Sequence, residues 1–309
     1  MTDFQAAASE YLALRRALGF RLVQAGRMLA SFASYLHEQG AERITTRIAL
    51  EWAVLPADAS RWWWQQRLSV ARGFARYLQA FDPATEVPPP GLICSPAPRV
   101  SPRAFCDAEV ASLMAAAGEL AHPLRAATYR ALIGLVAVTG CRVGEAIALD
   151  DSDVDPGERV IVIRNAKFGK HRQLVIHPTT AAALAGYAQA RQEHCPRPCS
   201  TAFFVSTRGT RLHYPNVGAL FRELAAQAGL EADRDGRFPT FHSLRHSFAM
   251  TTLAGWHEAG IDAEPLLPVL SAWLGHAGPA GSYWYLSATP GLLGQAARRL
   301  EDCAEGERS

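Results

Sequence analysis

Apolar residues in the first 82 positions recur at helical spacing in four stretches, about 11–18, 28–36, 45–52 and 60–80. Glycine follows the first two stretches, and a Thr-Thr pair precedes the third, which are typical ends and starts of helices. The fourth stretch carries three successive tryptophans near its start. We expect them to pack in the core with partial exposure, and stacking on nucleic-acid bases is the weaker alternative. The pattern predicts an all-helical domain over 1–82.

A proline-rich stretch follows this helical region. Residues 83–103 contain Pro83, the run Pro88-Pro89-Pro90, and three further prolines. Proline removes a backbone donor and stiffens the chain, so this stretch is not expected to hold a helix. We therefore predict an interdomain linker over 83–103 and a second domain over 104–309.

The second domain combines helical periodicity with two short β-type runs, 159–163 and 173–176. These runs are separated by a turn and predict a β-hairpin with Gly169 at its tip. Residues 105–109 resemble the N-capped start of a helix, and further helical patterns surround the hairpin, at about 124–138, 142–149, 179–192, 215–229, 242–256, 264–274 and 290–302. The predicted fold is mainly α with a small β-sheet: an all-helical N-terminal domain joined to an α+β second domain.

Composition narrows the class of protein. The 309 residues are 49% apolar and 19% charged, which is typical of a folded globular protein. No apolar run is long enough to span a bilayer, and the N-terminus lacks a secretory signal, so we expect a cytoplasmic protein. Six scattered cysteines suit reduced thiols. His194, Cys195 and Cys199 resemble a metal cluster only in part, because no second half matches them, so no metal and no cofactor is expected.

Lysine is rare in this chain. Only Lys167 and Lys170 are lysines among the 31 basic residues, and both lie in the turn of the predicted hairpin. Arginine stays protonated in proteins, whereas a lysine can give up its proton when its pKa is lowered. One of these lysines is thus a candidate acid. Chance retention in a polar turn explains the pair equally well when it is taken alone.

Four other segments of the second domain concentrate polar residues. Arg142 follows Thr-Gly-Cys at a helix start, and His242 and Arg245 share a helix face at a spacing of three. His276 follows a Leu-Gly helix stop, and the sequence Tyr-Trp-Tyr ends at Tyr285. Each residue alone is more typical of a structural role: a surface ion pair for the arginine, capping or burial for the histidines, and core packing for the tyrosine.

Together, these residues in this order resemble the tyrosine recombinase (phage integrase) family. The resemblance covers the whole second domain, and the helical N-terminal half is similar to the family's core-binding domain. The Tyr-Trp-Tyr-Leu-Ser-Ala-Thr-Pro ending resembles recombinases of bacterial mobile elements. Two tyrosines, Tyr283 and Tyr285, compete as nucleophile, and the nine-residue spacing from His276 favours Tyr285. The resemblance implies six catalytic residues: Arg142, Lys167, His242, Arg245, His276 and Tyr285.

The resemblance further implies cleavage and rejoining of DNA through a covalent 3′-phosphotyrosine, without metal or ATP. Double-stranded DNA is the expected partner, held between the two domains, with Lys170 and Arg172 contacting its backbone. Recombination of two duplexes implies a homo-tetramer on DNA or a hetero-assembly with other recombinases. Two alternatives remain: a type IB topoisomerase, and a catalytically silent DNA-binding accessory protein of a recombination complex.

Overall fold

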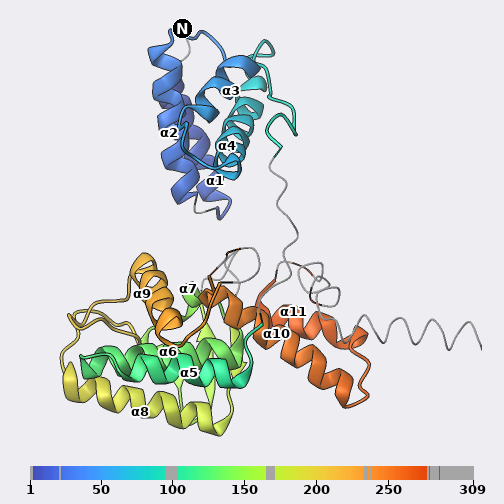
Figure 1. Ribbon diagram of the computed structural model, residues 1–309. Helices are drawn as coiled ribbons and strands as arrows, with labels where there is room; N and C mark the ends of the chain where they lie inside the picture. Colours follow the sequence, from blue (N-terminus) through green and yellow to red (C-terminus); the bar gives the residue numbers. More distant parts are fainter. Residues whose placement is uncertain are drawn as a thin grey trace, which may run out of the picture. The chain divides into compact units, whose positions relative to one another are not determined.

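The computed structural model describes residues 3–20, 22–94, 104–164, 171–232, 236, 238–276, 278 and 285. The chain divides into two compact units, Met1–Val100 and Ser101–Ser309. Within the described residues, no helix is long and apolar enough to cross a membrane. The first unit is helical, as predicted, and is coloured in blues in Figure 1; its helices are α1 (Phe4–Ala17), α2 (Val23–Glu38), α3 (Thr46–Val54) and α4 (Arg61–Gln79).

Side-chain caps start three of these helices. Asp3 accepts hydrogen bonds from the first turn of α1, Thr45 does so for α3, and Ser60 does so for α4. Trp52 lies at the centre of the core, 1% exposed, with the Arg67 guanidinium 3.8 Å from its ring centroid. Caps and core packing together explain why the apolar stretches of this region fold as helices.

The three tryptophans of α4 differ in their surroundings. Trp62 is 52% exposed, whereas Trp63 packs against the core of the unit. The indole N–H of Trp64 donates a hydrogen bond of 2.8 Å to the carbonyl of Pro56. Core packing with partial exposure is therefore confirmed.

The first part of the predicted linker packs against this helical unit. Glu86 accepts a 2.8 Å hydrogen bond from the backbone N–H of Thr46, which helps to cap α3. Arg72 of α4 donates to the carbonyls of Pro88 and Pro89, at 2.7 and 3.0 Å. Proline excludes a helix here, but its carbonyl remains a good acceptor, so the stretch up to residue 94 is tied to the domain before it.

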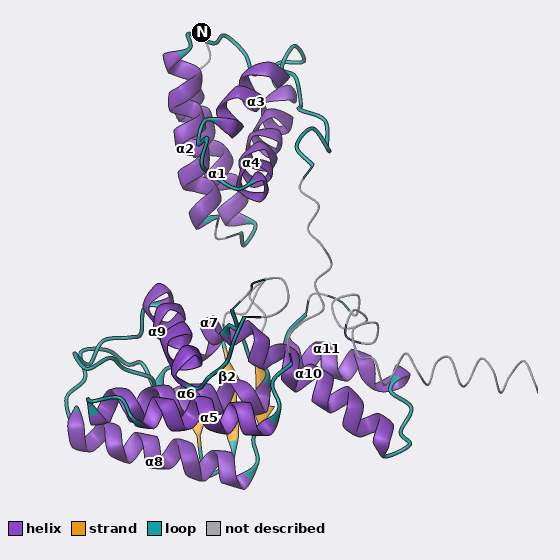
Figure 2. Cartoon of the chain, in the orientation of Figure 1, coloured by secondary structure: helices purple, strands orange, loops and turns teal. Residues whose placement is uncertain are grey.

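The second unit is built from helices around a small sheet (Figure 2). The sheet has the order β1-β2-β3 and is antiparallel throughout, with Ile163 paired to Arg172 at the hairpin end. The two-residue β1 was not predicted. The predicted 290–302 helix lies outside the described residues. The elements are α5 (Asp107–Gly118), α6 (Pro123–Thr139), α7 (Val143–Ala146), η1 (Asp151–Asp153), β1 (Val154–Asp155), β2 (Val160–Ile163), β3 (Arg172–Val175), α8 (Pro178–His194), α9 (Tyr214–Gln227), α10 (Phe241–Glu258), η3 (Glu264–Leu266) and α11 (Leu267–Leu274).

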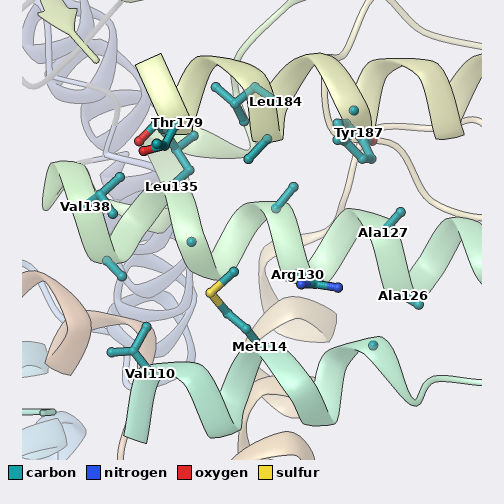
Figure 3. A pocket seen from close by; sticks show the side chains of 17 residues that line it. Val110, Met114, Ala126, Ala127, Arg130, Leu135, Val138, Thr179, Leu184 and Tyr187 are labelled. Atoms are coloured by element: carbon teal, nitrogen blue, oxygen red, sulfur yellow. The ribbon is translucent and has the colours of Figure 1, made fainter. Parts of the chain in front are cut away.

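Helix α6 is the centre of this unit. It runs beside α5 and α8, and its residues Leu132, Ile133 and Val136 are fully buried. An apolar cavity of about 590 Å³ opens between these three helices, and Met114 of α5, Arg130 of α6 and Tyr187 of α8 are among the residues that line it (Figure 3). The polar residues singled out from the sequence do not line this cavity, so it is separate from the candidate site.

Helix α6 ends at Gly140, and this end fixes the position of the site. Gly140 adopts a left-handed conformation with φ +62°, and a Cβ there would lie 2.5 Å from the ring of Phe248 on α10. Only glycine permits so close an approach of α10 to the end of α6. Helix α10 also shares a small apolar cluster with α11 and Tyr285.

Candidate active site

Arg142 and Glu145 form the first part of the site, at the start of α7. The Glu145 carboxylate accepts from the backbone N–H of Arg142 at 3.0 Å and from its guanidinium Nη1 at 2.8 Å. This is a capping box, which explains why a Gly-Cys-Arg-Val-Gly-Glu sequence starts a helix here. The second guanidinium nitrogen of Arg142 donates to the carbonyl of Gly275 at 3.0 Å.

Arg172 of β3 binds the same carboxylate. Its Nη2 lies 2.7 Å from Glu145 Oε2, and its Nε donates to the carbonyl of Trp273 at 2.8 Å. The Arg172 side chain is only 12% exposed, so it points into the site rather than outward from the hairpin. Burial opposes ionisation of Glu145, but the hydrogen bonds and charge of Arg172 and the bonds from Arg142 outweigh it and lower the Glu145 pKa.

Arg245 of α10, at 1% exposure, is the most deeply buried of the site's cations that the structure describes. Its two terminal nitrogens donate to the carbonyl of Gly140 at 2.7 Å and to the carbonyl of Leu274 at 2.8 Å. Burial, together with the nearby charge of Arg142, lowers its pKa to about 10. Arg245 therefore remains protonated at neutral pH while its charge is poorly compensated by the protein.

A cavity of about 380 Å³ lies where these groups meet. Arg142, His242 and Arg245 line it, together with Tyr214 and Arg222 of α9. Desolvation and the two arginine charges lower the pKa of His242. A cavity with guanidinium groups and an imidazole on its wall suits a negatively charged, oxygen-rich ligand such as a phosphate.

Tyr285 is 2% exposed and lies against two histidines, His246 and His276. Its hydroxyl is 2.9 Å from Nδ1 of His246, and its ring stacks on that of His276 with 6.3 Å between centroids. The His242 ring meets the His246 ring edge-on, at 4.4 Å between centroids. Burial raises the pKa of Tyr285, although the charge of Arg245 and a hydrogen bond from it work in the opposite direction.

The structure thus brings together five of the six predicted catalytic residues: Arg142, His242, Arg245, His276 and Tyr285. Lys167, Lys170 and the competing Tyr283 lie outside the described residues. Arg172, predicted as a DNA contact, lies with Arg142 and Arg245 in an arginine cluster, where its side chain donates to Glu145 and to the carbonyl of Trp273; its contact with DNA stays a prediction. Sequence reasoning missed His246, although its spacing of four from His242 placed both on one face of α10.

Comparison with known proteins gives a consistent result. The phage integrase family matches residues 104–289. A putative integrase/recombinase of Sinorhizobium fredii, y4rB, is 40% identical over 307 residues and covers 97% of this chain and 98% of its own length. Tyrosine recombinase XerD of Mycobacterium tuberculosis is 32% identical over 72% of this chain and 68% of its own length.

Solved structures show the same fold. The Tn1549 transposon integrase in complex with transposon right end DNA superposes with a TM-score of 0.66 at 16% identity, covering 96% of this chain and 99% of that one. The XerH site-specific recombinase bound to a palindromic difH substrate, in a post-cleavage complex, gives a TM-score of 0.65 at 19% identity, covering 90% of this chain and 79% of that one.

Proposed function

Because this chain belongs to the phage integrase family of tyrosine recombinases, we propose that it breaks and rejoins DNA through a covalent bond between Tyr285 and a 3′-phosphate. The observation that supports this most strongly is the convergence of Arg142, Arg245 and Tyr285, which come from α7, α10 and the segment after α11. Two guanidinium groups beside a buried tyrosine hydroxyl provide a phosphate clamp and a nucleophile in one place.

The first half of the reaction is a substitution at phosphorus. The phenol oxygen of Tyr285 bonds to phosphorus, the bond to the 5′-bridging oxygen breaks, and the tyrosine loses its proton. Arg142 and Arg245 hold the non-bridging oxygens and stabilise the added negative charge of the pentavalent transition state. Lys167 donates the proton that the departing 5′-oxygen takes up.

Rejoining reverses these steps on a different 5′-hydroxyl. The phosphotyrosine link conserves the energy of the phosphodiester, so no ATP is consumed. In this scheme, His242 helps to accept the tyrosine proton or to order the site, and His276 donates a hydrogen bond to a phosphate oxygen. Glu145 orients Arg142 and does not react, because both its oxygens already accept from arginines.

The substrate is double-stranded DNA, bound by both units of the chain. Contacts to the phosphate backbone supply most of the affinity, with Lys170 at the hairpin among them, so binding should weaken steeply as salt increases. Exchange between two duplexes needs four strand cleavages, and we propose that four subunits assemble on DNA, either four copies of this chain or a mixture with related recombinases.

A suicide substrate tests the nucleophile. A DNA duplex nicked near the cleavage point loses the short 5′-hydroxyl strand, so the covalent protein–DNA adduct accumulates and can be counted on a denaturing gel. The wild-type chain should form the adduct, and Tyr285→Phe should form none. An adduct with Tyr285→Phe but not with Tyr283→Phe would assign the nucleophile to Tyr283, and no adduct with wild type on its own flanking DNA would favour an accessory role.

A second substrate tests the acid. A 5′-bridging sulfur leaves without protonation, so Lys167→Ala should cleave this substrate at close to the wild-type rate while it fails on the oxygen substrate. Failure on both substrates by a folded variant would remove Lys167 from the acid role. Exchange of strands between two differently labelled duplexes then separates recombination from relaxation of supercoils alone.

A further inference from the structure

His246 makes a direct contact with the proposed reacting atom. Its Nδ1 lies 2.9 Å from the Tyr285 hydroxyl, within hydrogen-bond distance. The residue follows Arg245 directly on α10, and its ring also touches that of His242. One helix therefore delivers a phosphate-binding cation and a nitrogen base to the same tyrosine.

We propose that His246 receives the hydroxyl proton of Tyr285 when the phenol oxygen bonds to phosphorus, and returns it when the strand is rejoined. This inference rests on the proposed function. With its own proton on Nε2, the neutral imidazole accepts the hydrogen bond from the tyrosine through Nδ1. As the oxygen–phosphorus bond forms, the proton moves to Nδ1 and leaves an imidazolium. The 5′-oxygen takes its proton separately, from Lys167.

The surroundings keep His246 neutral before substrate arrives. Burial and the neighbouring His242, Arg245 and His276 lower its pKa to about 4, so the ring is free of charge at pH 7. A phosphate between the arginines carries negative charge that offsets Arg245. Because the positive charge that disfavours protonation is then reduced, the bound substrate itself makes His246 a better base.

The assignment separates the roles of the two histidines of α10. His242 lines the cavity beside Arg142 and Arg245, where a phosphate would sit. His246 lies deeper, against the phenol oxygen. The geometry therefore assigns the phosphate side to His242 and the proton of the nucleophile to His246.

The test uses His246→Asn in the full chain with the nicked suicide substrate. Asparagine can place an amide oxygen where Nδ1 stood and still accept a hydrogen bond from Tyr285, but it is not a base. We expect the adduct to form about 100-fold more slowly than with wild type at pH 7, the size of effect typical of general bases. An adduct that forms at the wild-type rate would show that His246 only positions the tyrosine, and would overturn the proposal.

A pH series distinguishes lost proton transfer from a distorted site. Without its base, the variant depends on direct ionisation of Tyr285, so its rate should rise about tenfold per pH unit up to pH ~10. The wild-type rate should rise less steeply, so the defect narrows as pH increases. A defect that stays constant over this range, in a variant with wild-type thermal stability, would refute the base role.

The 5′-sulfur substrate completes the design. Lys167→Ala should recover on it, whereas His246→Asn should remain slow, because the nucleophile still has to lose its proton. Recovery of His246→Asn on the sulfur substrate would place the residue on the leaving-group side and contradict the assignment. A wild-type chain that forms no adduct at Tyr285 would instead refute the proposed function, so the two failures are distinguishable.

Discussion

Replacing Gly275 by alanine should disturb the cluster of Arg142, Arg172 and Arg245, because the added methyl group collides with the Arg172 guanidinium. Gly275 ends α11 in a left-handed conformation with φ +68°, and a Cβ there would lie 2.6 Å from Nη1 of Arg172 and 3.5 Å from Nη1 of Arg142. Ordinary contact begins near 3.4 Å, so the Arg172 guanidinium has to withdraw by roughly 0.8 Å. That shift lengthens its hydrogen bond to Glu145, which measures 2.7 Å in the native site.

The expected cost has two parts. The left-handed backbone costs an alanine about 1–2 kcal/mol relative to glycine. A weakened hydrogen bond between charged groups adds about 1.5–3 kcal/mol. Gly260 supplies a matched control, because its φ is +69° and nothing lies within 4 Å of a Cβ built there. Gly260→Ala therefore measures the backbone part alone, and Gly275→Ala should cost about 2 kcal/mol more.

Calorimetric unfolding of the full chain measures the stability of both glycine variants. The transition that Glu145→Gln also shifts is the unfolding of the second unit, and the stability changes are taken from that transition. The double variant Gly275→Ala with Arg172→Gln should cost less than the sum of its two single changes, because the glutamine removes the atom with which the new methyl group collides. If Gly275→Ala costs no more than Gly260→Ala, the close approach of Arg172 to Gly275 does not contribute to stability and the reasoning is refuted.

Three further results follow from the same geometry. Glu145→Gln should destabilise the second unit by about 3 kcal/mol and slow adduct formation at least tenfold, since a buried charge partner is lost; unchanged unfolding would contradict this. His246 and His276 each have a pKa of about 4 in the fold against an ordinary 6.5, so the unfolded chain binds protons first as pH falls. The free energy of unfolding is therefore unaffected by these two histidines above pH 6.5 and decreases as pH falls toward 4. After discounting for partial solvent exposure, the Tm of the wild-type chain should fall by about 5 °C between pH 7 and pH 5. The fall in Tm should be smaller in His276→Gln, which lacks one of the two groups. Lys167→Arg keeps the charge and should lose cleavage of the oxygen substrate, whereas Lys170→Arg should cleave normally; equal activity of the two would remove the distinction between them.

Most of the fold could be predicted because its helices carry the periodicity and the caps that define them. The prediction of the helix start near residue 105, for example, rests on a sequence in which Glu109 accepts from the backbone N–H of Cys106, a purely local interaction. Strand β1 has only two residues, so it offers no period to detect. The packing of residues 83–94 on the first unit depends on Arg72, far away in sequence, and proline content alone does not show it.

The candidate site was predictable as an ordered set of residue types, but not as a set of contacts. The orientation of Arg172 illustrates the difference. A position on a β-hairpin beside two lysines predicts a contact with DNA but no contacts within the protein. The side chain in fact also binds Glu145 and the carbonyl of Trp273, which lies 101 residues further along the chain. The position of α11 decides where this side chain points, and no local pattern around residue 172 contains that information.

The way in which the arginines are held explains how the site keeps its positive charge. Carboxylates would hold three guanidinium groups firmly but would cancel the charge that a phosphate needs. Here the described structure shows Glu145 shared by Arg142 and Arg172, while the carbonyls at two helix ends complete the binding. Gly140 at the end of α6 and Leu274 at the end of α11 both accept from Arg245, and Trp273 and Gly275 accept from the other two arginines.

Carbonyls at helix C-termini lack intrahelical partners and carry only partial negative charge. They can therefore orient Arg142, Arg172 and Arg245 and still leave a net positive charge over the cavity. A guanidinium suits this arrangement because its five N–H groups are spread over three nitrogens of a rigid planar fork, so separate nitrogens can bind the carbonyls while further N–H groups face a phosphate; a lysine ammonium has three donors on a single nitrogen and is held in place less well. The preference of the site for arginine, and its dependence on the Leu-Gly stop of α11, thus have the same physical origin.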